Sequence, residues 1–89
     1  MIVKNIEYSR NFCKDLKKIP QDIKEKLIKT EKIFKENPLH PSLRLHRLHG
    51  KLKEFWSISI NMDYRIIFRR IDDGTIVFFS IGKHDIYEK

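Results

Sequence analysis

The sequence has little of what a disulfide-stabilised or membrane-spanning protein needs. Its 89 residues include a single cysteine, Cys13. One cysteine excludes an internal disulfide, which fits a reducing compartment. No apolar run approaches the length needed to cross a bilayer, and the first residues lack an apolar stretch followed by a small-residue cleavage site. We therefore expect a cytoplasmic protein that does not enter a membrane.

Acidic residues are outnumbered, with 12 Asp and Glu against 19 Lys and Arg, which gives a net charge of +7. No acidic residue lies between Asn37 and Lys53, a segment that holds Arg44, Arg47, Lys51, Lys53 and the histidines His40, His46 and His49. A basic segment of this kind attracts polyanions, most commonly nucleic acid. The lysines from Lys14 to Lys35 are instead interleaved with Asp and Glu, and we interpret them as a solvated helical face.

The first half of the chain predicts a strand and a helical hairpin. Residues 2–8 alternate loosely and favour a strand. Ser9 is a suitable N-cap for a first helix, because apolar residues recur at helical spacing after it. Pro20 ends that helix and can open a second, which stops at Asn37-Pro38. The inner stripe of the second helix is Ile23, Leu27, Thr30 and Phe34.

The second half predicts three antiparallel strands. Residues 55–60 and 64–71 alternate with period two, and residues 75–81 are rich in β-branched and aromatic side chains. Asp72-Asp73-Gly74 is a strong hairpin turn between the last two strands. Trp56 shares a face with two isoleucines, which indicates a core position.

These elements predict one α+β domain over residues 1–89, in the order β-α-α-β-β-β. The helices must cover one face of the antiparallel sheet to bury their apolar stripes. The other face is then expected to be free of helices and to carry a polar and basic set, Ser57, Ser59, Arg65 and Arg69.

Three segments resemble the RelE/ParE superfamily of type II toxins. They are Leu48-His49-Gly50 followed by Phe55-Trp56-Ser57-Ile58, then Asp63-Tyr64-Arg65-Ile66-Ile67-Phe68, and finally Ile81-Gly82-Lys83-His84-Asp85-Ile86-Tyr87. The resemblance covers the whole chain and implies the RelE-like fold. It also implies a toxin that a cognate antitoxin protein neutralises.

The resemblance implies ribosome-dependent cleavage of mRNA, the activity of the RelE, YoeB, HigB and YafQ branches. Such an endoribonuclease acts on mRNA in the ribosomal A site, beside 16S rRNA, and needs no metal or other cofactor. The ParE branch of the same fold inhibits DNA gyrase instead, and an inactive relative would only bind an antitoxin. Fold alone does not choose among these alternatives.

The resemblance also indicates catalytic residues. Cleavage requires a base for the ribose 2′-OH, cations at the phosphate, and an acid for the departing 5′-oxygen. Arg65 matches the arginine at the scissile phosphate, and His84 matches the tail histidine of the YafQ and YoeB branches. His46 and Asp63 resemble a histidine and an acidic residue of YafQ-like toxins. The YafQ pattern has a further histidine where this chain has Ser59, so the set is a hybrid.

We expect a second group of residues to bind RNA. Lys51 and Lys53 resemble lysines of RelE, and Tyr87 matches a tail aromatic that can stack on a base. Arg44 and Arg47 of the basic segment, and Arg69 of the basic sheet face, complete this group. Each also has an ordinary structural reading, as a solvated loop or strand residue. The histidines have no recognised zinc spacing, and we expect no metal site.

Overall fold

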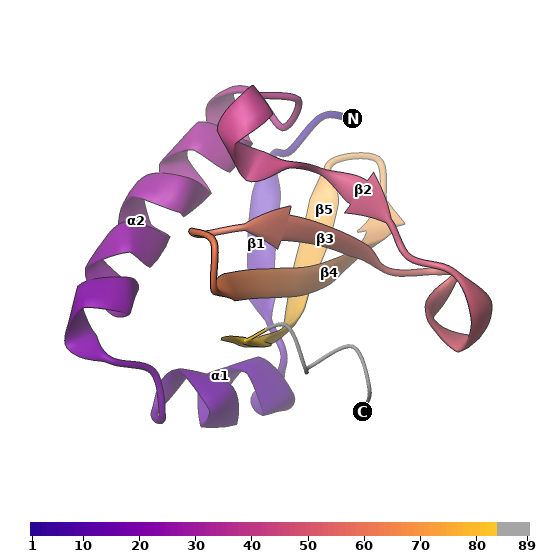
Figure 1. The fold of residues 1–89 in the computed structure, drawn as a ribbon. Coiled ribbons are helices and arrows are strands. Elements are labelled where there is room, and N and C mark those ends of the chain that lie inside the picture. Colours follow the sequence, from indigo (N-terminus) through magenta and orange to yellow (C-terminus); the bar gives the residue numbers. More distant parts are fainter. Residues whose placement is uncertain (84–89) are drawn as a thin grey trace.

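The structure, a computed structural model, describes residues 1–83 as a five-stranded sheet with two α-helices (Figure 1). The elements, with η for a 3-10 helical turn, are β1 (Asn5–Tyr8), α1 (Arg10–Leu16), α2 (Gln21–Glu36), η1 (Pro41–Leu43), β2 (His46–Arg47), η2 (Gly50–Leu52), β3 (Trp56–Ser59), β4 (Tyr64–Asp72) and β5 (Thr75–Lys83). The predicted α+β class, and the order of one strand, two helices and then antiparallel strands, are confirmed.

The strands lie in the order β1-β5-β4-β3-β2, so that β4 is the middle strand. It pairs antiparallel with β3 and β5, and β1 adds to the far edge of β5 in a parallel pair. The sequence predicted neither this parallel pair nor β2. A strand of two residues has no periodicity to detect, and its existence depends on pairing with β3.

The two helices begin and end close to the predicted residues. The Ser9 hydroxyl accepts a hydrogen bond from the backbone N–H of Phe12 at 3.0 Å, which caps α1. Helix α2 follows Pro20, and Asn37 is its C-cap. Neither helix in residues 1–83 combines the length and the apolar character that crossing a membrane requires.

Polar side chains of α1 protect the edge of β5 beyond the end of β1. The Ser9 hydroxyl donates to the carbonyl oxygen of Phe79 at 2.9 Å. Farther along, the Asp15 carboxylate accepts from the Ser80 hydroxyl at 2.7 Å and from the backbone N–H of Ile81 at 3.2 Å. An open strand edge would leave these backbone groups unpaired. Helix α1 and its N-cap therefore hold the last strand in place as far as Ile81.

The core lies between the helices and one face of the sheet, as predicted. Phe78 has no exposed surface, and its ring centroid lies 5.5 Å from that of Phe12, 5.9 Å from that of Phe34 and 6.4 Å from that of Phe68. These four rings come from α1, α2, β4 and β5, so one aromatic cluster joins both helices to the sheet. Trp56 packs against this core with part of its surface exposed.

The opposite face differs from the prediction. Buried Leu48 and Ile67 form a second apolar cluster there, with Leu52 and Phe55 packed against it. The Phe55 ring also lies 5.1 Å from that of Phe79. The loop around η2 folds over the middle of the face that was expected to be free, because burial of these apolar side chains stabilises that position. Ser57 and Ser59 of this face are only 0% and 6% exposed.

One polar contact joins β1 to α2. The Tyr8 hydroxyl donates a hydrogen bond to the Glu31 carboxylate. Partial burial, followed by the hydrogen bond and the negative charge of Glu31, raises the pKa of Tyr8 to about 12. The Tyr8 phenol therefore stays protonated, and can donate this hydrogen bond, throughout the neutral and mildly alkaline range.

Replacement of Phe78 by alanine should lower the free energy of unfolding by about 3–5 kcal/mol, because it empties the centre of the aromatic cluster. Its neighbour Phe79 is 40% exposed and provides a matched control. Phe79→Ala should cost about 1–2 kcal/mol, since less apolar surface is lost. Urea unfolding followed by circular dichroism measures both. Equal losses would contradict the position assigned to Phe78.

Candidate functional site

Arg65 is the second residue of the middle strand, β4, on the face away from the helices. In the register of β4 it stands between Ser59 of β3 and Gly82 of β5. Its Nη1 donates a hydrogen bond to the Ser59 hydroxyl, so the guanidinium leans across β3. Arg65 is half-buried, while Gly82 contributes no side chain above it. The guanidinium is therefore anchored on one side and reachable from solvent on the other.

His46 faces the same side of the sheet as Arg65. It pairs with Ser57, which in turn pairs with Ile67 on β4, two residues beyond Arg65. Paired residues of neighbouring strands point to one face. Two strand spacings and two residues along the strand separate the two backbones by about 12 Å. The register therefore places both residues on one face of the sheet.

The hydrogen bond of His46 decides which of its nitrogens can exchange a proton. Nδ1 lies 3.2 Å from the carbonyl oxygen of Arg44. A carbonyl can only accept, so Nδ1 carries the hydrogen, and Nε2 of the neutral ring holds the lone pair. Arg44 takes the left-handed conformation, with φ of 48°, which aims this carbonyl at the ring. His46 thus presents Nε2 as a possible base.

His40 has the opposite arrangement and a structural role. The backbone N–H of Ser42 donates to His40 Nδ1 at 3.2 Å, at the start of η1. A backbone N–H can only donate, so Nδ1 is the acceptor and Nε2 carries the hydrogen in the neutral ring. His49, also in the basic segment, is exposed and makes no capping hydrogen bond with its side chain.

Asp63 lies in the turn between β3 and β4, and its side chain is exposed. The turn itself is built by Asn61, whose side-chain oxygen accepts from the backbone N–H groups of Asp63 at 2.9 Å and Tyr64 at 2.8 Å. The ion pairs within residues 1–83 are Arg69–Glu54 and Arg70–Asp73, so Asp63 is not paired with Arg65. Asp63 therefore stands near the start of the Arg65 strand without contacting the guanidinium.

The described chain ends beside this site. Lys83 pairs with Tyr64, one residue beyond the pair of Arg65 and Gly82. His84 and Tyr87, which the sequence assigned to catalysis and RNA binding, lie outside the described residues. Within residues 1–83, no three His, Cys, Asp or Glu side chains gather in a way that could hold a metal ion.

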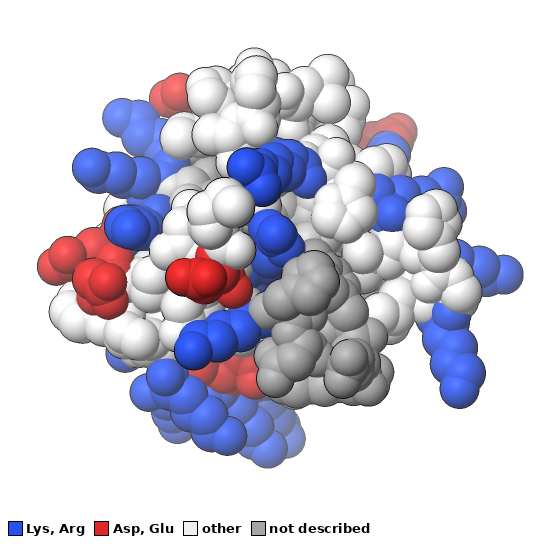
Figure 2. All heavy atoms as spheres, viewed as in Figure 1, with Lys and Arg blue, Asp and Glu red and all other residues white. Residues whose placement is uncertain are grey.

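The residues expected to bind RNA divide between two surfaces. Lys51 and Lys53 are exposed on and beside η2, the loop that covers Ile67 on the Arg65 face, and basic side chains project where Figure 1 places this loop (Figure 2). Arg44 is exposed just before His46. Arg47, in contrast, pairs with Trp56 and lies over its ring at 5.8 Å, on the helix side of the sheet. The structure does not bring Arg47 to Arg65.

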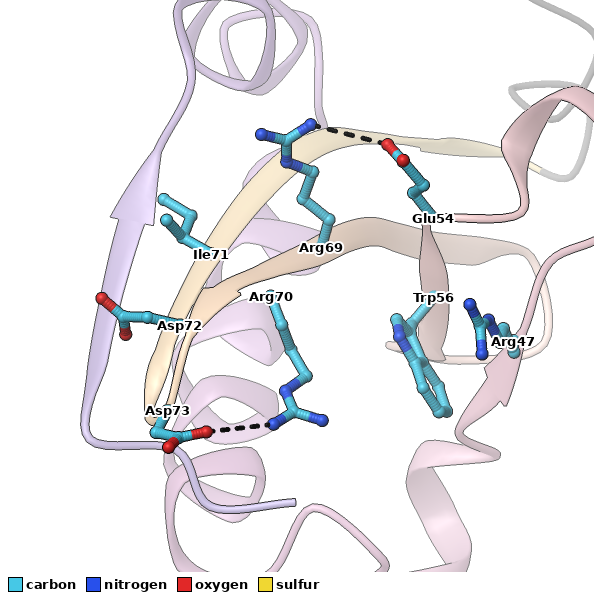
Figure 3. Close-up of a pocket in the computed structure, with 8 residues that line it drawn as sticks. All are labelled: Arg47, Glu54, Trp56, Arg69, Arg70, Ile71, Asp72 and Asp73. Atoms are coloured by element: carbon cyan, nitrogen blue, oxygen red, sulfur yellow. Dashed lines mark ion pairs between the residues drawn. The ribbon is translucent and has the colours of Figure 1, made fainter.

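Arg47 and Arg69 belong to a separate hollow of about 510 Å³, where the β4–β5 hairpin extends beyond β3 (Figure 3). Arg69 lies 4.0 Å from Glu54, and Arg70 lies 3.7 Å from Asp73. The lining is Arg47, Glu54, Trp56, Arg69, Arg70, Ile71, Asp72 and Asp73, of which three side chains are basic and three acidic. This charge balance gives the hollow little attraction for a polyanion. Neither Arg65 nor His46 is part of its lining.

Ser59 is the residue whose role the sequence did not reveal. The sequence showed only that a serine stands where the YafQ pattern has a histidine. The structure shows that its hydroxyl accepts from Arg65. Period-two alternation had already placed both residues on one face, but their direct pairing depends on the β3–β4 register, which no local pattern specifies.

A strand, two helices and a mixed sheet whose middle strand carries an arginine away from the helices define the RelE-like class of toxin folds. The model of a family described as "Bacterial toxin of type II toxin-antitoxin system, YafQ" matches residues 4–88. This chain belongs to the YafQ toxin family, within the RelE/ParE superfamily that the sequence motifs indicated. No curated protein matches the chain.

Solved structures agree with this assignment. The crystal structure of YafQ from Escherichia coli strain BL21(DE3) has a TM-score of 0.78 and 24% identity over 94% of this chain and 97% of that one. The DinJ–YafQ toxin–antitoxin complex of E. coli has a TM-score of 0.75 and 25% identity over 96% and 97%. A protein of Helicobacter pylori, HP0894, has a TM-score of 0.71 and 26% identity over 96% and 97%.

The two histidine arrangements make a prediction with an internal control. At a pH at which both imidazole rings are neutral, long-range ¹H–¹⁵N spectra should show His46 protonated at Nδ1 and His40 protonated at Nε2. The reason is that the backbone partner of His46 is a carbonyl acceptor, whereas that of His40 is an N–H donor. Assignment by His46→Gln and His40→Gln variants identifies the two signals. The same tautomer in both rings would contradict the arrangement at His46.

Proposed function

We propose that this YafQ-family toxin is a ribosome-dependent endoribonuclease that cuts mRNA by attack of a ribose 2′-OH on the neighbouring phosphate. The observation that supports this most is the Arg65 guanidinium, anchored by Ser59 on the same sheet face as His46 Nε2. A phosphate on that face would meet a fork of cationic donors and a group able to move a proton.

The reaction needs no group outside the RNA and the protein. The 2′-oxygen forms a bond to phosphorus while the bond from phosphorus to the 5′-oxygen breaks. The proton of the 2′-OH passes to a base, and the 5′-oxygen receives a proton from an acid. The products are a 2′,3′-cyclic phosphate, or a 3′-phosphate after hydrolysis, and a 5′-hydroxyl.

Arg65 is proposed to stabilise the extra negative charge that the phosphate acquires in the transition state. Its planar fork matches two phosphate oxygens, and half-burial strengthens the interaction by excluding water. Ser59 holds one end of the guanidinium, so the side chain does not have to be ordered when the RNA arrives. Ser59 acts through Arg65 and is therefore a positioning residue.

His46 is proposed to exchange a proton through Nε2, and His84 of the tail is proposed as its partner in acid–base catalysis. Asp63 remains a candidate for orienting a histidine or a ribose hydroxyl. Lys51, Lys53 and Arg44 are proposed to hold RNA backbone on the same side as Arg65, and Tyr87 to stack on a base. The proposal omits Arg47, which lies over the Trp56 ring, and Arg69, which forms an ion pair with Glu54.

The proposed partners are mRNA in the ribosomal A site, the surrounding 16S rRNA, and a cognate antitoxin. The complex of E. coli YafQ with DinJ is a relative in which such a pair is seen. With a net charge of +7, this toxin would attract an antitoxin segment of opposite charge. A protein of 89 residues also has a small core, so binding of a partner would add to its stability.

Arg65→Ala should lower the rate of mRNA cleavage by about 100-fold or more, since a charge-stabilising group is lost. Arg65→Lys should restore only part of the rate, because an ammonium lacks the planar fork. Arg70→Ala is the matched control: it lies on the same strand, pairs with Asp73, and should leave cleavage unchanged. Primer extension on mRNA from a translating extract measures all three.

Ser59→Ala should slow cleavage by on the order of 10-fold through loss of a hydrogen bond to a charged group. Ser59→Thr restores the hydroxyl and should recover the rate. Ser80→Ala removes another buried hydroxyl, which is 2% exposed and bonded to Asp15 of α1, and separates general destabilisation from loss of positioning. Full activity in both Arg65→Ala and Ser59→Ala would overturn the site, and gyrase-dependent DNA breaks without mRNA cuts would establish the ParE-like alternative.

A further inference from the structure

A second, smaller hollow lies between helix α2 and the end of β3, and it shares Ser59 with the Arg65 site. Its volume is about 180 Å³, and its lining is Lys26, Lys29, Thr30, Ile33, Ser42, Leu43, Ser59 and Ile60. It therefore lies between the middle of α2, the η1 turn and the last residues of β3. Ser59 is common to both places, because the same residue that lines this hollow accepts the hydrogen bond of Arg65.

The charge of this hollow differs from that of the hollow around Trp56. Two lysines contribute to its lining and no carboxylate does, whereas the larger hollow has three of each sign. Lys26 and Lys29 are three residues apart, which places them on one side of α2. Within the described residues neither lysine belongs to an ion pair. The hollow therefore combines two uncompensated ammonium groups with a lining of hydroxyl and apolar side chains.

The hydroxyls of the hollow are already engaged, so its attraction comes from charge. Thr30 donates to the carbonyl oxygen of Lys26 at 2.9 Å, and the Ser42 hydroxyl lies 2.9 Å from His40 Nδ1. A space of this size is smaller than the usual pocket for a whole small molecule, of about 300 Å³ or more. It fits one compact anionic group, which a lysine pair binds as point charges.

We propose that the hollow lined by Lys26 and Lys29 is a phosphate subsite, which binds an RNA phosphate other than the one held by Arg65. This assignment rests on the proposed function of Arg65 and extends it to helix α2. Lys26 and Lys29 are thereby assigned a binding role, whereas the other lysines of α2 remain part of a solvated face. The phosphate comes from the strand being cut or from ribosomal RNA, and the two sources share the same chemistry.

The test compares two lysine pairs with the same spacing on the same helix. Lys26→Gln/Lys29→Gln removes the charges of the hollow, and Lys32→Gln/Lys35→Gln removes two exposed charges outside it. All four side chains are exposed, so both variants should unfold thermally like the wild type. The probes are a short single-stranded RNA with 2′-O-methyl riboses, which cannot be cut, and isolated small ribosomal subunits.

The variant Lys26→Gln/Lys29→Gln should bind one of the probes on the order of 10-fold more weakly. The slope of log K against the logarithm of salt concentration should fall in magnitude by about 1.4, because two phosphate contacts to a single strand are lost. The variant Lys32→Gln/Lys35→Gln should stay within about twofold of the wild type. Loss with the RNA oligomer assigns the phosphate to the cut strand, and loss with the subunits alone assigns it to ribosomal RNA.

Equal losses in the two variants, or no loss with either probe, would overturn the subsite. Weakened binding to an acidic antitoxin alone would also overturn it. Failure of the proposed function is a separate result: a wild-type protein that binds the uncuttable RNA but never cuts mRNA disproves catalysis, while the lysine comparison still decides the subsite.

Discussion

Alternation along β4 is the constraint on which the rest of the structure depends. Ile66 and Phe68 enter the core beneath the helices and are fully buried, so Arg65 and Ile67 must face the other side. A shift of one residue would exchange the two sets. It would place the Arg65 guanidinium among phenylalanine rings, where an unpaired charge is very unfavourable. The packing of the core therefore also specifies where the cation of the site stands.

The second face follows from the same constraint. Ile67 points away from the helices and attracts Leu48, Leu52 and Phe55, which draws the basic loop over the sheet. The loop carries Lys51 and Lys53 to the side of Arg65 without covering the guanidinium completely. Where the YafQ pattern has a histidine, the short side chain of Ser59 gives Arg65 an anchor instead. In the proposed mechanism the site is therefore built around a held arginine, with His46 as the nearby proton carrier.

Local patterns were enough to predict the helices, the hairpin turn and the inner face of each long strand, because each depends on residues close in sequence. The second apolar cluster was not predictable, since Phe55 meets Phe79 across 24 positions of the chain only after the loop has folded. The face of the sheet on which Arg47 lies depends on its pairing with Trp56, in a strand of two residues that no local pattern predicts. The family motifs indicated Arg65 and His46 as site residues, yet only the register shows that one face carries both.

The central claim is that this face cuts RNA by attack of the ribose 2′-OH. The most direct measurement is the chemical nature of the ends that the purified wild-type toxin leaves on mRNA bound to programmed ribosomes. The account predicts a 2′,3′-cyclic phosphate or 3′-phosphate on one fragment and a 5′-hydroxyl on the other. Fragments with a 3′-hydroxyl and a 5′-phosphate would mean that water attacks instead, and intact mRNA would mean that the protein acts only by binding.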